Sequence, residues 1–82
     1  MKTLLMFVAH WSAPSLHQRQ LLEQIAIPFV LEIIDVCEDC TLAIKYGIRI
    51  IPTLLLLEND EPISRLAGFT TKENLELWLN AI

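Results

Sequence analysis

The sequence predicts one α/β domain with the element order βαβ(α)ββα. Short apolar runs suit strands that are covered on both faces, amphipathic segments between them suit helices, and glycine and proline stand at the boundaries. The chain has 82 residues, of which 54% are hydrophobic and 20% are charged. This length supports a single core, and this composition excludes an intrinsically disordered chain. We therefore expect one domain that covers residues 1–82.

The first half of the chain is predicted to form a strand, a helix and a second strand. Residues 4–9 are continuously apolar, as in a buried parallel strand. A helix should begin around residues 12–14, where proline is tolerated, and Pro28 should end it. Its buried face should hold Leu21, Leu22 and Ile25, and its solvated face His17, Gln18, Arg19 and Gln20. Residues 29–35 then form a second strand, parallel to the first.

The second half is predicted to form a short helix, a hairpin and a last helix. The short helix should end at Gly47, because glycine adopts the left-handed conformation of a helix end. Pro52 should stand at the entrance of a strand, followed by a hairpin with its turn at residues 59–61. Thr70 and Glu73 fit a capping box. Helical spacing continues through Leu75, Trp78, Leu79 and Ile82.

Charge and hydropathy exclude several function classes. The net charge is −4 and the six basic residues are scattered, which argues against a nucleic-acid surface. No run reaches the ~18–20 apolar residues that span a bilayer, so we expect no membrane contact. Met1 and Lys2 before the apolar run imitate a secretory signal, but no A-x-A cleavage site follows, and we interpret the run as a strand. The expected location is the cytoplasm.

Several residues together resemble the thioredoxin family. They are Trp11 and Pro14 in "WSAPS", the run "YGIRIIPT" that ends at Thr53, and Gly68 before the last helix. The chain is similar to the short, glutaredoxin-sized members of that family over nearly its whole length. The resemblance implies a thioredoxin-like fold, in which a four-stranded mixed sheet is flanked by helices.

The family carries two cysteines in a W-C-x-P-C motif, and this chain has Ser12 and Ser15 at those places. The resemblance implies that the first cysteine, at a helix N-terminus, attacks a substrate disulfide and that the second resolves the mixed disulfide. A serine hydroxyl cannot form a stable bond to sulfur. The resemblance thus implies a parent protein that reduces protein disulfides, and a chain that is inactive at Ser12 and Ser15 as written.

More than one explanation of these serines is open. Serine is an ordinary N-cap residue, so a helix start without chemistry is one interpretation. A laboratory Cys-to-Ser double substitution, which keeps the shape of the dithiol form, is the interpretation that we favour. The alternative is a natural binding module that lost its redox pair and holds an extended peptide in the same groove.

The resemblance also implies a docking surface and a set of partners. The surface consists of Trp11, Ala13, Pro14, Ile51 and Pro52. We expect a cis Ile51–Pro52 peptide within van der Waals reach of Ser12, and a partly exposed Trp11 beside Pro52. The partners are protein disulfide substrates and a reductase. The chain should be a monomer, and no cofactor is expected.

A second pair at CxxC spacing, Cys37 and Cys40, lies in "VCEDC". We consider both an accessory disulfide or redox role and no chemical role for this pair. We expect no metal, because a structural zinc normally takes four ligands and the only histidines are His10 and His17. Loops at the carboxyl ends of parallel strands share one edge of the sheet, so Cys37 should lie near Ser12.

One place departs from the family pattern. Full-length relatives carry a buried acid and a lysine in the first two strands of this core, where this chain has Met6 and Leu31. The resemblance therefore implies that solvent carries the protons, or that the mechanism is closer to that of glutaredoxin. His10 and His17 flank the site, and we interpret both as solvated surface side chains.

Overall fold

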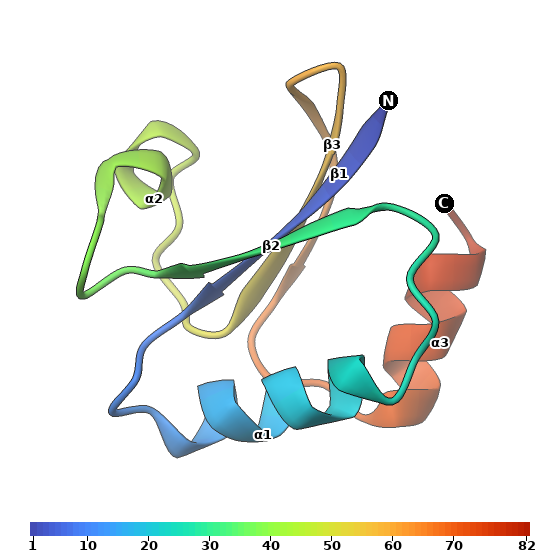
Figure 1. Ribbon diagram of the computed structural model, residues 1–82, viewed down its shortest axis with the longest axis horizontal. Helices are drawn as coiled ribbons and strands as arrows, with labels where there is room; N and C mark the ends of the chain where they lie inside the picture. The colour runs from blue at the N-terminus through green and yellow to red at the C-terminus, as the bar shows by residue number, and fades with distance from the viewer.

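A computed structural model of the chain describes all 82 residues as a four-stranded mixed sheet flanked by three helices (Figure 1). The order confirms the predicted βαβ(α)ββα arrangement. The elements are β1 (Lys2–Val8), α1 (Ala13–Glu23), β2 (Val30–Asp35), α2 (Thr41–Lys45), β3 (Thr53–Glu58), β4 (Glu61–Ala67) and α3 (Lys72–Asn80). None of the helices is both long enough and apolar enough to span a membrane.

The strands lie side by side in the order β2-β1-β3-β4. β1 pairs in parallel with β2 and antiparallel with β3, and β3 forms an antiparallel hairpin with β4. The two inner strands are covered on both faces, and residues 4–8 and 54–57 are buried. Full coverage explains why their sequences are continuous apolar runs. β1 ends one residue earlier than predicted, because the N–H of Ala9 donates to the Ser15 hydroxyl instead of joining the ladder.

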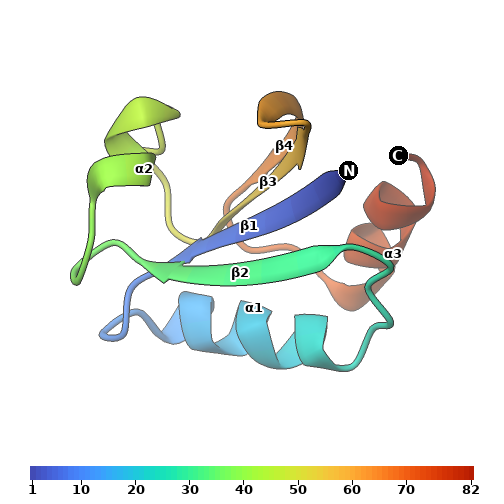
Figure 2. The ribbon, with the colours of Figure 1, turned by 45° about the horizontal axis from the view of Figure 1, so that its top comes forward.

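Side chains of the inner strands alternate between two core clusters, one on each face of the sheet. Leu4, Met6 and Val8 pack with Leu22 and Leu75, which come from α1 and α3. The intervening side chains of β1 and β3 pack with Ala43 of α2. Figures 1 and 2 show the same division, with α1 and α3 on one face and α2 on the other.

The places of the family's buried acid and lysine lie within the first of these clusters. Met6 is fully buried there, and Leu31 packs against the same cluster. Both positions are therefore part of an apolar core, and neither side chain can carry a proton.

Helix α1 differs from the prediction at its end and on one face. It stops at Glu23, before Pro28, because Ile25 and Ile27 both pack against the core cluster. Residues two apart on a helix point in different directions, so a continued helix could not bury both. The solvated position predicted for Gln18 is wrong, since this side chain is 1% exposed.

Gln18 is buried because of its position on the helix. It follows Ser15 by three residues and precedes Leu22 by four, and these three are the buried residues of α1. Its Oε1 accepts the N–H of Thr70 at 2.7 Å, while its Nε2 is buried without a partner. A polar residue on the inner face of a helix is not distinguished from a solvated one by its type alone.

The predicted turn and cap positions are correct to within a residue. Asn59 and Asp60 have positive φ values of 51° and 69°, as in a two-residue hairpin turn, and Glu61 is already paired within the hairpin. Gly47 has the predicted left-handed conformation, with φ of 66°.

The last helix begins one residue later than the predicted capping box. Thr71 is the N-cap of α3, and its hydroxyl accepts the N–H of Asn74 at 3.2 Å. The box at Thr70 and Glu73 is therefore wrong, because the N–H of Thr70 is bound by Gln18 instead. Ile82 lies beyond the helix but still packs against the core.

Candidate functional site

Three segments meet at the edge of the sheet where β1 and β2 end. Val8 and Asp35, at the ends of these parallel strands, are paired, so the loops after them start side by side. β3 runs antiparallel to β1, with Thr53 beside Phe7, which brings the preceding Pro52 to the same edge. This edge therefore carries the serines at positions 12 and 15, the thiol loop and the proline that the sequence singled out.

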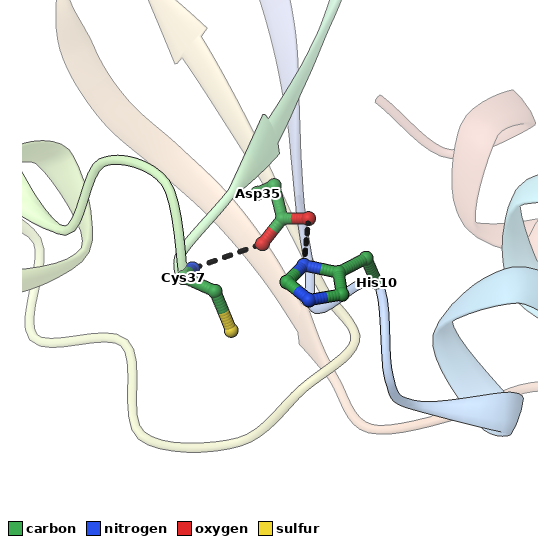
Figure 3. Close-up of side chains that lie close together, drawn as sticks. All are labelled: His10, Asp35 and Cys37. Carbon is green, nitrogen blue, oxygen red and sulfur yellow. Dashed lines mark hydrogen bonds and ion pairs between the residues drawn. The ribbon is translucent and has the colours of Figure 1, made fainter.

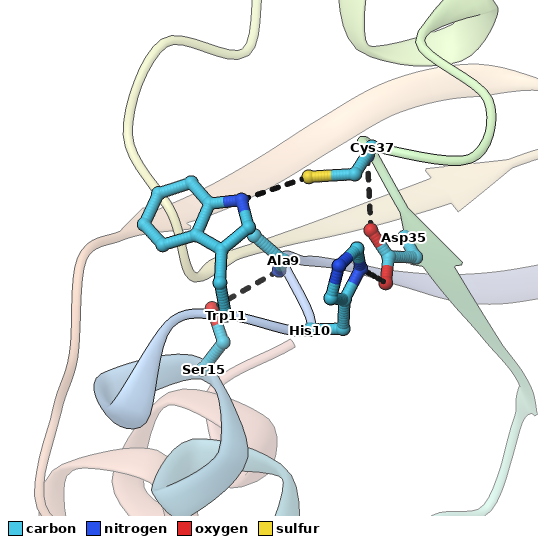
Figure 4. A network of polar contacts seen from close by, with 6 residues as sticks. All are labelled: Ala9, His10, Trp11, Ser15, Asp35 and Cys37. Atoms are coloured by element: carbon cyan, nitrogen blue, oxygen red, sulfur yellow. Dashed lines mark hydrogen bonds and ion pairs between the residues drawn. The ribbon is translucent and has the colours of Figure 1, made fainter.

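Ser12 and Ser15 are held within the first turn of α1. Ser12 is the N-cap, and its Oγ accepts the N–H of Ser15 at 3.3 Å. The Oγ of Ser15 accepts the N–H of Ala9, also at 3.3 Å (Figure 4). The two serines are 7% and 0% exposed. Both hydroxyls are thus fixed at a helix N-terminus, where the backbone N–H groups and the helix dipole favour negative charge.

The peptide bond between Ile51 and Pro52 is cis, the isomer that the resemblance implied. The Pro52 side chain is fully buried, and its carbonyl oxygen accepts the N–H of Gly68 at 2.8 Å. Ile51 is partly exposed, and Ile50 is 54% exposed. A partner at this edge would therefore meet the residues before the proline rather than its ring.

Trp11 extends from the loop after β1 and is 72% exposed, more than the partial exposure expected. Its indole Nε1–H donates to the Sγ of Cys37 at 2.9 Å (Figure 4). This bond joins the loop after β1 to the loop after β2. Cys37 therefore contacts the residue that precedes Ser12, while its nearness to Ser12 itself stays a prediction.

Cys37 and Cys40 are both exposed free thiols. Cys40 is the N-cap of the short helix α2, without a side-chain capping bond. Asp39 instead accepts the N–H of Thr41 at 2.9 Å, and this bond holds the pKa of the Asp39 carboxyl below its usual value. An accessory disulfide between the two cysteines stays a prediction about an oxidised form.

Asp35 connects the thiol loop to the loop after β1. One carboxylate oxygen accepts the N–H of Cys37 at 2.9 Å, and the other lies 3.0 Å from Nδ1 of His10 (Figure 3). The hydrogen bond from the Cys37 N–H is the main reason that the pKa of Asp35 lies below its usual value. Desolvation raises this pKa, and the hydrogen bond and charge of His10 lower it further. His10 is an exposed side chain, as predicted, but it is engaged by Asp35.

A shallow hollow of about 430 Å³ lies beside the first turn of α1. Ala13 and Pro14, two predicted docking residues, line it together with His17 and Phe69. The His17 and Phe69 rings are 4.9 Å apart at an angle of 30°. Sequence reasoning missed Phe69, although it directly follows Gly68, which has a positive φ of 83° and turns the chain there.

Comparisons with known proteins agree with this geometry. The sequence model of the family described as Thioredoxin matches residues 1–81. A thioredoxin of Staphylococcus aureus is 34% identical over 74 residues, which cover 84% of this chain and 70% of the relative. The family match therefore includes the serine turn, the thiol loop and the cis proline.

Solved structures show the same fold. A mutant thioredoxin from Halobacterium salinarum NRC-1 superposes with a TM-score of 0.85 at 28% identity, covering 98% of this chain and 73% of that one. Fasciola hepatica thioredoxin gives a TM-score of 0.86 at 22% identity, covering 98% and 79% of the two chains. The second likeness is one of fold alone.

Proposed function

The chain belongs to the thioredoxin family, and from that premise we propose that positions 12 and 15 are the positions of the two redox sulfurs. The homologues support a thiol-disulfide oxidoreductase function, with protein substrates and a reductase as partners in general. The observation that carries the proposal is the hydrogen-bonded turn that presents Ser12 and Ser15 at the N-terminus of α1. It lies directly after an inner strand of the sheet.

In the cysteine form, the thiolate at position 12 attacks a substrate disulfide. A bond forms between this sulfur and one substrate sulfur, and the other substrate sulfur leaves as a thiolate that takes a proton from water. The thiol at position 15 then loses its proton and attacks the sulfur at position 12. The second substrate thiol leaves, and a disulfide between positions 12 and 15 remains for a reductase to reduce.

The environment of these positions suits the first sulfur as a thiolate. The free N–H groups at the start of α1 stabilise a negative charge there. The apolar Met6 and Leu31 stand where the family has its buried acid and lysine, so in this proposal protons come from solvent. A serine hydroxyl is a far weaker acid than a thiol, and the chain with Ser12 and Ser15 does not complete this cycle.

The proposed docking surface is formed by Trp11, Ala13, Pro14, Ile51 and Pro52. The exposed indole of Trp11 and the partly exposed Ile51 support direct contact with an extended peptide. The buried Pro52 acts by setting the direction of the backbone before it, within van der Waals reach of position 12. Ala13 and Pro14 contribute the hollow that Phe69 completes.

The experiment restores both sulfurs through the double substitution Ser12→Cys and Ser15→Cys. Insulin reduction by dithiothreitol should then be catalysed, while the chain as printed shows only the background rate. A matched variant that adds Cys37→Ser and Cys40→Ser should retain the activity. If activity depends on Cys37 and Cys40, or appears in the printed chain, the proposal is wrong.

The same assay distinguishes the rival function. A natural peptide-binding module would bind an extended peptide with equal affinity before and after the double substitution, and it would show no turnover. The encoded residues at positions 12 and 15 in the source gene report whether the serines are a laboratory replacement, as we propose, or natural.

We also propose a cellular location and an oligomeric state for the protein. We place it in the cytoplasm, where exposed thiols such as Cys37 and Cys40 stay reduced. We expect a monomer that binds neither nucleic acid nor membranes, consistent with its net charge of −4. Size-exclusion chromatography with light scattering checks the oligomeric state.

A further inference from the structure

Three side chains with different donor atoms converge between the loops after β1 and β2. They are His10, Asp35 and Cys37, and their nitrogen, oxygen and sulfur atoms all lie within 4.8 Å of one another. Figure 3 shows the imidazole ring and the Cys37 sulfur on the same side of the Asp35 carboxylate. The redox chemistry proposed for positions 12 and 15 uses none of these three side chains.

This set of donor atoms is one that zinc accepts. Zn²⁺ binds imidazole nitrogen, carboxylate oxygen and thiolate sulfur, and sites with three protein ligands keep the fourth position for water or another ligand. Tetrahedral zinc bonds place such donors about 3.3–3.6 Å apart. His10 and Cys37 are exposed, so small rotations of their side chains close the remaining gap.

The surroundings favour a bound cation in two ways. One carboxylate and one thiolate balance the two charges of the ion, in a chain that already carries a net charge of −4. His10 and Asp35 also line a hollow of about 290 Å³, where the carboxylate of Glu38 offsets the charge of Arg19 and space is left for a small fourth ligand.

Two of the three ligands, Asp35 and Cys37, already accept a hydrogen bond that orients them. The Cys37 N–H holds one oxygen of Asp35, and the Trp11 indole N–H donates to the Cys37 sulfur (Figure 4). A sulfur that accepts this bond keeps it when it binds a metal, since a thiolate has several lone pairs. Hydrogen bonds to metal ligands of this kind orient them and strengthen binding.

From this arrangement we infer that His10, Asp35 and Cys37 form a zinc-binding site with an open fourth position. Binding releases the thiol proton of Cys37 and places the ion next to the sulfur that the Trp11 indole N–H contacts. We expected no metal from the sequence because a structural zinc takes four ligands and the chain has only two histidines. This count of ligands did not include Asp35, which the pairing of β1 with β2 brings beside His10.

The chain supplies its own matched controls for a test with zinc chloride. Zinc affinity is measured for the printed chain by competition with a chromophoric chelator, in the presence of a reductant that is not a thiol. The test variants are His10→Ala, Cys37→Ser and Asp35→Asn. The matched control variants change a residue of the same type outside the site and are His17→Ala, Cys40→Ser and Asp39→Asn.

We expect the printed chain to bind one zinc ion. Loss of a hydrogen-bonded neighbour of a ligand weakens metal binding roughly 10- to 100-fold, so each test variant should raise the Kd by at least about 100-fold. The three control variants should leave the Kd for zinc unchanged. Circular dichroism verifies that all six variants are folded, and asparagine keeps an oxygen that can accept the Cys37 N–H.

Cobalt(II) gives a second, spectroscopic measurement. A thiolate-to-cobalt charge-transfer band should appear with the printed chain and with Cys40→Ser, and it should be absent with Cys37→Ser. The inference is overturned if the printed chain binds no zinc. It is equally overturned if Cys40→Ser abolishes binding while His10→Ala does not, because the ion would then lie in the thiol loop alone. Neither result depends on disulfide reduction at positions 12 and 15.

Discussion

Two four-residue segments at one edge of the sheet, 12–15 and 37–40, carry a pair of serines and a pair of cysteines at the same spacing. The two pairs differ in how far their side chains are exposed. The hydroxyls of Ser12 and Ser15 are buried, whereas the thiols of Cys37 and Cys40 are exposed, and neither thiol is in a disulfide. The first segment forms the N-cap and first turn of an eleven-residue helix packed on the core, whereas the second precedes a helix of five residues and reaches it only at its N-cap, Cys40. Side chains within the first turn of a core-packed helix are therefore held more firmly than side chains in a loop before a short helix.

The largest expected effect is a difference in thiol reactivity. A Cys37→Ser and Cys40→Ser background that also carries Ser15→Cys presents a single thiol at a position that is fully buried. Its alkylation by iodoacetamide should be at least about 10³-fold slower in the folded than in the unfolded chain, because reaction needs local or global opening. Cys37 and Cys40 in the printed chain should react at nearly their unfolded rates.

Ser12→Cys in a chain that also carries Cys37→Ser and Cys40→Ser should give an intermediate alkylation rate, since position 12 is 7% exposed. Equal rates at positions 12, 15 and 37 would mean that the two segments are equally open, and the comparison would be wrong.

A smaller effect is expected in the free energy of unfolding. Ser15→Ala leaves the buried N–H of Ala9 without its acceptor and should cost about 1–3 kcal/mol. Ser12→Ala removes an N-cap and should cost about 1 kcal/mol. Cys40→Ser changes an exposed side chain without a capping bond and should stay within about 0.5 kcal/mol. Urea denaturation measures all three, and a Cys40→Ser cost as large as that of Ser15→Ala would contradict the comparison.

The smallest effect is the response to acid of two carboxylates, Asp39 within the second segment and Asp35 two residues before it. The pKa values of Asp35 and Asp39 are lowered in the fold by the N–H groups of Cys37 and Thr41. A lowered pKa stabilises the fold above the unfolded value, about pH 4, and this stabilisation is lost as the pH falls through the folded pKa. The double variant Asp35→Asn and Asp39→Asn should therefore lose less stability than the printed chain below about pH 4.

Ser15→Ala is the control for this titration, because the segment 12–15 has no titratable side chain. It should lower the free energy of unfolding by a similar amount at each pH. Parallel curves for the printed chain and the double aspartate variant would contradict the assignment of the acid response to Asp35 and Asp39.

The sequence predicted those features that depend on local chemistry or on strong patterns. The apolar inner strands, the left-handed Gly47 and the strand after Pro52 follow from hydropathy and backbone constraints. The serine turn was found because residue types and spacing along the chain are enough to indicate a helix start.

Side-chain contacts between distant segments were missed. Gln18 looks solvated until Thr70 is known to lie beside it, and that contact also moves the N-cap of α3 to Thr71. His10 and Asp35 are 25 residues apart, and only the register of β1 with β2 brings them together. Sequence patterns describe what one segment prefers, whereas these contacts need two segments at once.

The hydrogen bond from Thr70 to Gln18 has a mechanical consequence for binding. It ties the segment that carries Phe69 to the middle of α1, so the two walls of the hollow beside Pro14 move together. A guest peptide that tilts α1 therefore displaces Phe69 as well. The width of this opening therefore depends jointly on α1 and on the loop before α3, and weakening this hydrogen bond would change which peptides fit without altering any residue that touches them.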